Sequence, residues 1–264
     1  MTPKSFNGAI IIYGPPGSGK GTQANIIGKY FNLTHLDTGR LVEKLVHNPR
    51  LKNDPIIKKE RKKFDSGKLC TISWVVRIVK EEIEKIYKKG KGIIFSGSPR
   101  TLYEAKRLIP YLEKLYKKEK ICVIRILIKP QTSIFRNSHR KVCEKCGYIL
   151  VYSKKNKNLK KCPICNGKLV RRTLDDPKII RIRIKEYKKR TEPIYKYLTK
   201  RGIKIIDING EPSVEKVTQN IIKNLKNCIS PPSISPLKKG GDRGGNKNDY
   251  YKNKKRDRNI KRGR

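Results

Sequence analysis

The most informative part of the sequence is Gly8-Ala-Ile-Ile-Ile-Tyr-Gly-Pro-Pro-Gly-Ser-Gly-Lys-Gly-Thr22. It begins as a short apolar run, passes through a glycine-rich loop and leads into Gln23–Tyr30, which has the pattern of a helix. Between a strand and a helix, consecutive loop amides can surround phosphate oxygens, and Lys20 can reach the terminal phosphates. The spacing Gly14-x4-Gly19-Lys20 therefore predicts a nucleotide-phosphate site, with a chance glycine-rich turn as the alternative.

The rest of the chain to residue 229 continues the strand and helix alternation. Further apolar, β-branched runs occur at Gly92–Phe95, Ile121–Ile128 and Ile203–Ile208. Helix-length amphipathic segments separate and follow these runs: Ile72–Lys88, Leu102–Tyr116, Pro177–Leu198 and Ser213–Asn227. This alternation predicts an α/β fold with a doubly wound parallel sheet. Thr38–Lys68, with two short expected helices, and Lys141–Arg172 interrupt the pattern and are expected to be insertions.

Four of the seven cysteines form two close pairs. Cys143-x2-Cys146 and Cys162-x2-Cys165 are separated by fifteen residues, the spacing of a four-thiolate zinc site. Four thiolates fill a tetrahedral Zn²⁺, so we expect a structural ion with no open position for catalysis. Redox disulfides are the alternative. Cys70, Cys122 and Cys228 are expected to be core thiols.

The loop and three later segments resemble the adenylate kinase family. Gly14–Gln23 is similar to the family signature, which shares this Lys-Gly-Thr variation; Asp37-Thr38-Gly39 resembles the family's Ser-Thr-Gly, and Ser66–Leu69 resembles the end of its monophosphate-binding insertion. Ser96–Thr101 looks like the Asp-Gly-Phe-Pro-Arg-Thr segment. The resemblance covers roughly residues 7 to 228 in the family's order along the chain. It implies reversible phosphoryl transfer from ATP, with Mg²⁺, to AMP beneath a zinc-binding lid, by a monomer.

The resemblance also implies domain boundaries. A P-loop core would comprise residues 1–36, 69–135 and 173–229, with a monophosphate-binding insertion at 37–68 and a zinc-binding lid at 136–172. Residues 230–264 are rich in proline, glycine and basic residues, which predicts a disordered tail. The tail could be a nonspecific RNA-binding or membrane-surface arm, or a solvated extension with no specific role.

The same resemblance assigns roles to individual residues. Arg136 and Arg140 are four residues apart, so on a helix both would point at a polyphosphate. The catalytic residues would be Lys20, Arg136, Arg172 and Arg183. The ATP site would comprise Gly14, Pro15, Pro16, Gly17, Ser18, Gly19, Lys20, Gly21, Thr22, Arg136, Arg140 and Gly210. The monophosphate site would comprise Thr38, Gly39, Arg40, Cys70, Gly97, Arg100, Glu104, Arg172 and Arg183.

Five positions depart from the family pattern, mostly on the acceptor side. Ser96 replaces an aspartate that orients magnesium-bound water, and Arg40 and Glu43 carry the family's two charges in reversed order. Glu104 replaces a glutamine that reads adenine; since an ionised carboxylate only accepts, it would suit guanine better, unless it points away. Leu174 replaces an aspartate. The alternatives are therefore a kinase for another monophosphate such as GMP, or a catalytically weakened nucleotide- or RNA-binding protein.

The chain is strongly basic, with 66 Lys and Arg against 22 Asp and Glu and a formal net charge of +44. Nucleotides, nucleic acid or acidic lipid would suit this charge, and so would a lysine-biased composition with no anionic partner. The sequence contains no apolar stretch of 18 residues, and its first residues lack the pattern of a signal peptide. We therefore expect a soluble, cytoplasmic protein.

Overall fold

The computed structural model describes residues 5–152, 156, 158–171 and 175–229. Within this part of the chain, a five-stranded parallel sheet has the order β2-β3-β1-β4-β8. Its strands are β1 (Ala9–Tyr13), β2 (Thr34–Asp37), β3 (Ile93–Ser96), β4 (Ile121–Leu127) and β8 (Ile205–Asn209). The expected α/β fold with a parallel sheet is confirmed. β2 is an additional strand, at the edge of the sheet, that sequence analysis did not anticipate.

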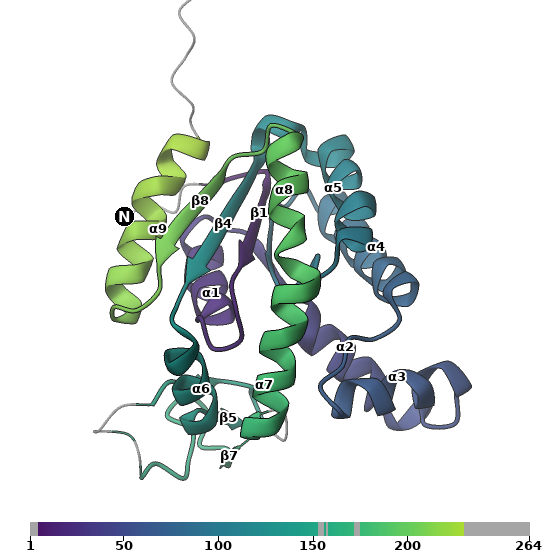
Figure 1. Cartoon of the computed structure of the whole chain (residues 1–264), viewed down its shortest axis with the longest axis vertical. Coiled ribbons are helices and arrows are strands. Elements are labelled where there is room, and N and C mark those ends of the chain that lie inside the picture. The colour runs from purple at the N-terminus through teal and green to yellow at the C-terminus, as the bar shows by residue number, and fades with distance from the viewer. Residues whose placement is uncertain (1–4, 153–155, 157, 172–174, 230–264) are drawn as a thin grey trace, which may run out of the picture. The chain divides into compact units, whose positions relative to one another are not determined.

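Both faces of the sheet are covered by helices (Figure 1). Successive residues of β1 point to opposite faces: Ala9 and Ile11 belong to one buried cluster, and Ile10 and Ile12 to the other. The first cluster includes side chains of α4 (Ile72–Lys88), α5 (Leu102–Tyr116) and α8 (Pro193–Lys200). The second includes those of α1 (Lys20–Tyr30) and α9 (Val214–Ile229). Because both faces of the sheet are buried, the strands are continuous apolar runs and do not alternate between apolar and polar residues.

Two segments lie outside these layers. Between β2 and α4 the chain forms α2 (Thr38–Val46), a 3₁₀ turn η1 (Pro49–Leu51) and α3 (Pro55–Asp65), which confirms the two short helices expected there. After β4, α6 (Pro130–His139) leads into β5 (Lys141–Cys143), β6 (Ile149–Leu150) and β7 (Leu169–Val170). These strands pair antiparallel in the order β6-β5-β7. Their buried cluster is small and includes Cys143 and Cys162, so the cysteines make up much of this module's core.

The long helix expected at Pro177–Leu198 is interrupted. α7 (Pro177–Glu186) continues into a π-helical turn, η4 (Tyr187–Thr191), before α8 begins at Pro193. Proline at the start of α8 cannot donate a backbone hydrogen bond to the preceding turn, which accounts for the break. Within this π-helical turn, the hydroxyl of Thr191 donates to the carbonyl of Arg100 at 2.7 Å. This hydrogen bond connects the turn to the loop after β3.

Cys122 and Cys228 form a disulfide, which corrects the expectation that both are core thiols. Cys122 lies on β4 and Cys228 near the end of α9, and the packing of that helix on the sheet brings the two together although 106 residues separate them. Cys70 is a buried free thiol, as expected. None of the described helices is long and apolar enough to cross a membrane. The tail predicted for residues 230–264 lies outside the described residues.

Candidate active site

The loop between β1 and α1 has a backbone that requires glycine. Gly17 and Gly19 have φ angles of 76° and 89°, in the left-handed region that residues with a Cβ rarely adopt. A Cβ on Gly17 would also lie 2.6 Å from Nδ2 of Asn137 on α6. Gly19 is the N-cap of α1 and offers no side chain to the first-turn N–H groups. Those groups can therefore donate to an anion, the arrangement that binds phosphate.

Lys20 lies where this loop meets the helix, among other cations. Its Nζ donates to the carbonyls of Gly14 and Pro15, at 2.7 and 2.8 Å. Burial, followed by the nearby guanidinium groups of Arg100, Arg183 and Arg140, lowers the pKa of Lys20 to about 7. So much positive charge around a partly desolvated lysine stabilises its neutral form, and a polyanion would reverse that effect. The surroundings of Lys20 are therefore suited to several phosphate groups.

The loop lines a cavity of about 450 Å³ at the carboxyl ends of β1, β2 and β3. Residues of the segment after β2, of the loop after β3, of α6, of α7 and of the segments that follow β6 and β8 also line it. This volume lies within the usual range for small-molecule sites, and the carboxyl ends of parallel strands are where open α/β sheets bind ligands.

Arg136 and Arg140 enter this cavity from the lid side but are held differently. The Arg136 guanidinium donates to the carbonyls of Gly210, at 2.9 Å, and Glu211, at 3.0 Å. Arg140 lies just after the last residue of α6 with extended backbone, so the two do not share one helical face as expected. Arg140 is instead oriented by a bidentate pair with buried Asp175, at 2.7 and 2.5 Å. Both nevertheless line the cavity.

Arg100 and Arg183 also line the cavity. Nε of Arg100 donates to the carbonyl of Gly97 at 2.5 Å, and its Nη2 lies 3.3 Å from the position that a Cβ on Gly39 would take. Arg183 on α7 lies 3.8 Å from Asp175 through Nη1. The Asp175 carboxylate thus lies close to the guanidinium groups of both Arg140 and Arg183. The guanidinium groups that line the cavity are held in place by main-chain carbonyl oxygens and by Asp175.

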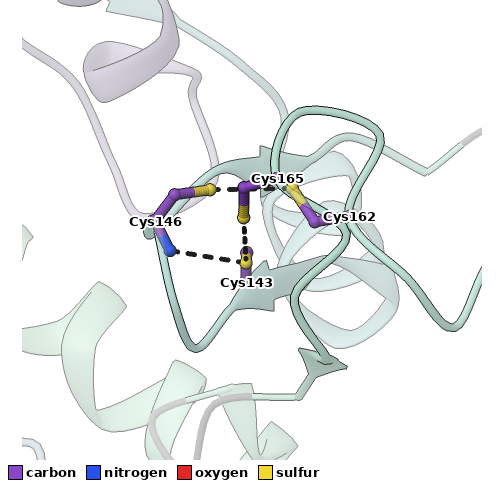
Figure 2. Close-up of side chains that lie close together, drawn as sticks. All are labelled: Cys143, Cys146, Cys162 and Cys165. Atoms are coloured by element: carbon purple, nitrogen blue, oxygen red, sulfur yellow. Dashed lines mark hydrogen bonds between the residues drawn. The ribbon is translucent and has the colours of Figure 1, made fainter.

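The two cysteine pairs come together in the β5–β7 module (Figure 2). Their four sulfurs lie within 4.8 Å of one another, with Cys143 and Cys165 at 3.5 Å and Cys146 and Cys162 at 3.6 Å. A tetrahedral zinc with Zn–S bonds of about 2.3 Å requires sulfurs roughly 3.8 Å apart, so the set fits the ion. The N–H of Cys146 points at Cys143 Sγ and lowers the pKa of that thiol to about 6. These cysteines are suited to bind zinc.

Comparison with known proteins places the sequence in a family. The family model described as adenylate kinase matches residues 12–203. The adenylate kinase of Methanothrix thermoacetophila is 36% identical over 82% of this chain and 97% of its own. Those of Acetivibrio thermocellus and Archaeoglobus fulgidus are each 34% identical, over 82% and 80% of this chain and 97% and 95% of theirs. The chain belongs to the adenylate kinase family. The match includes the loop from Gly14 to Thr22 and all four paired cysteines, since both lie within residues 12–203.

Most residues that the adenylate kinase resemblance assigns to nucleotide binding line the cavity. On the ATP side they are Gly14, Pro16, Gly17, Ser18, Gly19, Lys20, Gly21, Thr22, Arg136, Arg140 and Gly210. On the acceptor side they are Gly39, Arg40, Gly97, Arg100 and Arg183. Pro15, Thr38 and Cys70 do not line it: Thr38 and Cys70 are buried behind the wall, and the Pro15 carbonyl accepts from Lys20. Arg172 lies outside the described residues.

Glu104 is not brought to the cavity wall. Its buried carboxylate accepts hydrogen bonds from the Ser98 hydroxyl at 2.9 Å, the Arg100 N–H at 2.8 Å and the Thr101 hydroxyl at 3.3 Å. Burial raises the pKa of Glu104, and the Arg100 N–H opposes that rise. Glu104 therefore holds the loop that carries Arg100. The structure does not present this carboxylate to a base, which removes the geometric ground for a guanine preference.

Sequence analysis missed several cavity residues in this adenylate kinase. Asp37 lines the cavity but was noted only as part of a motif. Tyr13, at the end of β1, also lines it, and its buried hydroxyl lacks a hydrogen-bond partner among the described residues. Phe135 and Tyr152 contribute aromatic lining from the lid side. The ends of parallel strands are a recognisable signal for Asp37 and Tyr13, whereas nothing in the sequence marks the two lid aromatics.

Proposed function

We propose that this protein is an ATP:AMP phosphotransferase that moves the terminal phosphoryl group of ATP to AMP and gives two ADP. The convergence of Arg100, Arg140 and Arg183 on Lys20 carries the proposal, because all four cations surround one cavity next to the glycine-rich loop. Phosphoryl transfer needs two aligned nucleotides and neutralisation of the charge on the moving group. Few other reactions require so many fixed cations at one point.

The cavity divides naturally into donor and acceptor sides. ATP phosphates would lie on the glycine-rich loop and Lys20, with Arg136 and Arg140 above them. The monophosphate would lie under the helical insertion proposed at 37–68, against Arg40 and Arg100. Arg183, and Arg172 by resemblance alone, would bridge the two nucleotides at the transferred group. The closeness of Arg100 to Gly39 supports this division, since it brings the insertion and the β3 loop to the same end of the cavity.

Two metal ions complete the proposal. Mg²⁺ bound with ATP would neutralise phosphate oxygens, and Thr22 and Asp37 supply oxygen ligands or water partners of the type it prefers. A zinc ion held by Cys143, Cys146, Cys162 and Cys165 would stabilise the lid proposed at 136–172, whose buried cluster is otherwise small. The zinc would do no chemistry. From the resemblance alone, we also propose a monomer that acts in the cytoplasm.

AMP is the acceptor we favour. The competing case for GMP depends on a free Glu104 carboxylate, and both Glu104 oxygens accept hydrogen bonds from their own loop. Diphosphate formation from ATP and each of AMP, GMP, CMP, UMP and dTMP, with Mg²⁺, tests the choice. AMP should be the best acceptor, and Glu104→Gln should alter the protein's stability more than its order of preference. A preference for GMP that Glu104→Gln shifts to AMP would refute this assignment.

The same assay separates a working enzyme from a nucleotide- or RNA-binding protein that has lost its chemistry. Lys20→Met should abolish turnover, whereas Lys29→Met, an exposed lysine on the same helix, should not change it. Absence of turnover in the wild-type protein, with nucleotide binding retained, would favour the binding protein. RNA retention at low salt that disappears on deletion of residues 230–264 would add a role for the tail.

A further inference from the structure

Asp37 and Ser96 are neighbours across two strand ends. β2 and β3 are parallel and adjacent, and the last pair in their register is Asp37 with Ser96. Ser96 also pairs with Ile12 of β1, so both residues end their strands beside the glycine-rich loop, and both line the cavity. In the family pattern the residue types are reversed, with serine at the first position and aspartate at the second. Compared with the family pattern, the carboxylate therefore lies on β2 instead of β3, and the hydroxyl lies on β3 instead of β2.

The Ser96 hydroxyl is already engaged. Its Oγ lies 2.7 Å from Nε2 of His35, and Nδ1 of that ring lies 2.6 Å from Oδ1 of Asn25. Because the Asn25 oxygen can only accept, Nδ1 carries the hydrogen and Nε2 of a neutral ring accepts from Ser96. Burial lowers the pKa of His35, which favours that neutral ring. Ser96 therefore donates to His35 and brings no charge to the cavity.

Asp37 is positioned to supply that charge. Its Oδ2 lies 4.0 Å from the position that a Cβ on Gly21 would take, directly after Lys20. Among the described residues that line the cavity, Asp37 and Glu186 are the carboxylates, and Glu186 pairs with Arg190 at 2.8 Å. The Asp37 carboxylate pairs loosely with Arg40, at 3.6 Å, and the two side chains are 24% and 44% exposed. Asp37 is thus the acid nearest the phosphate-binding loop in the described part of this cavity.

We infer that Asp37 is the positioning carboxylate for the divalent cation that accompanies ATP, a role moved from the end of β3 to the neighbouring end of β2. It orients the water shell of the cation beside the phosphates and need not touch the reacting atoms. The inference depends on the proposed function only in taking ATP as the donor. Asp37 also caps α2, since its Oδ1 accepts from the Arg40 N–H at 3.2 Å.

Asp37→Asn separates the two tasks, because asparagine caps a helix about as well as aspartate but carries no charge. The probe is Mn²⁺, titrated by electron paramagnetic resonance into enzyme saturated with the ATP analogue AMP-PNP. We expect Asp37→Asn to weaken Mn²⁺ binding in this complex roughly tenfold or more, the usual loss when a metal's outer-shell partner is removed. Binding of the metal-free analogue should stay the same or tighten, because a negative charge is gone. Asp54→Asn, a cap of α3 that does not line the cavity, is the matched control.

The decisive variant is Asp37→Ser with Ser96→Asp, which restores the family arrangement. It should recover Mn²⁺ affinity that Asp37→Ser alone loses. Equal Mn²⁺ affinity in Asp37→Asn and the wild-type protein would overturn the inference. A parallel loss of metal-free nucleotide binding would also overturn it, because Asp37 would then support the nucleotide site as a whole rather than the cation. Both readouts are independent of turnover. A wild-type protein that transfers no phosphoryl group but shows the Mn²⁺ effect would refute the proposed function and leave Asp37's role intact.

Discussion

Asp175→Asn should cost both stability and rate, because Asp175 is a buried carboxylate between two cavity arginines. Its side chain is 2% exposed and that of Arg140 is 16% exposed. Asparagine can accept one of the two Arg140 hydrogen bonds, and its amide nitrogen faces the other donor. Losing one charge-assisted bond and the carboxylate's charge costs about 2–4 kcal/mol at such a site. For a chain of this size, that lowers the melting temperature by about 5–15 °C.

A matched control exists in the same fold. Arg125 and Asp207 form a bidentate pair of the same distances, 2.7 and 2.5 Å, but their side chains are 30% and 44% exposed. Solvent screens that pair, so Asp207→Asn should cost no more than about 1 kcal/mol. Thermal unfolding of both variants, with and without ATP, measures the difference. Since ATP brings negative charge to Arg140, its stabilising effect should be at least as large in Asp175→Asn as in the wild-type protein.

Turnover distinguishes positioning from mere stability. With Arg140 no longer held, the rate of diphosphate formation at saturating substrate should fall roughly tenfold or more, well below the melting temperature. Two results would refute this reasoning. One is equal stability of Asp175→Asn and Asp207→Asn, which would mean that the buried pair contributes nothing. The other is a destabilised variant with unchanged turnover, which would mean that Arg140 does not need Asp175 to work.

Three further predictions concern groups elsewhere in the chain. Lys20 has a pKa of about 7 in the free protein, so its amine is mostly neutral above that pH. ATP binding at pH 8 should therefore take up protons as phosphate raises the Lys20 pKa, with less uptake toward pH 6. Calorimetry in buffers of different ionisation enthalpy measures the uptake, and its persistence in Lys20→Met would contradict the prediction. Opening the 106-residue loop closed by Cys122 and Cys228 should cost about 3–5 kcal/mol. Cys228→Ser and reductant should therefore each lower the melting temperature by about 10 °C without additivity, and a wild-type protein insensitive to reductant would exclude the effect. Cys146→Ser should reduce bound zinc from one ion per chain while the core keeps its cooperative unfolding, as elemental analysis and calorimetry can show; a full zinc complement would argue against the site.

The sequence predicted the strands that have long apolar runs, and it missed features that depend on where a segment lies in the folded sheet. β1, β3 and β4 are buried on both faces, so they appear in the sequence as recognisable β-branched, apolar runs. β2 has the sequence Thr-His-Leu-Asp and lies at the sheet edge with one buried residue, so it carries no such run. The Cys122–Cys228 disulfide could not be inferred either, because spacing alone does not show which helix packs on which strand.

The site residues, too, were predictable only where local sequence determines their geometry. The glycine-rich loop and the paired cysteines were predictable because local spacing determines their geometry. Glu104 was assigned to base recognition by its place in a motif, but the carboxylate accepts hydrogen bonds within its own loop. The local neighbours that satisfy it, Ser98 and Thr101, are visible in the sequence. Their orientation is not, because it depends on how the loop folds back at the end of β3.

The altered positions on the acceptor side together redistribute charge within the site. Glu104 lies behind the wall and holds the loop of Arg100, as Asp175 lies behind the wall and holds Arg140. These buried acids position groups that line the cavity, Arg100 through its loop and Arg140 directly, and they do not line it themselves. A carboxylate in the lining of this cavity is needed only to orient the divalent cation that accompanies ATP. Asp37 lines the cavity close to Gly21, the residue after Lys20, and can take that role. Substitution of Ser96 for the family's aspartate is then compatible with full activity, because the charge that matters lies one strand away.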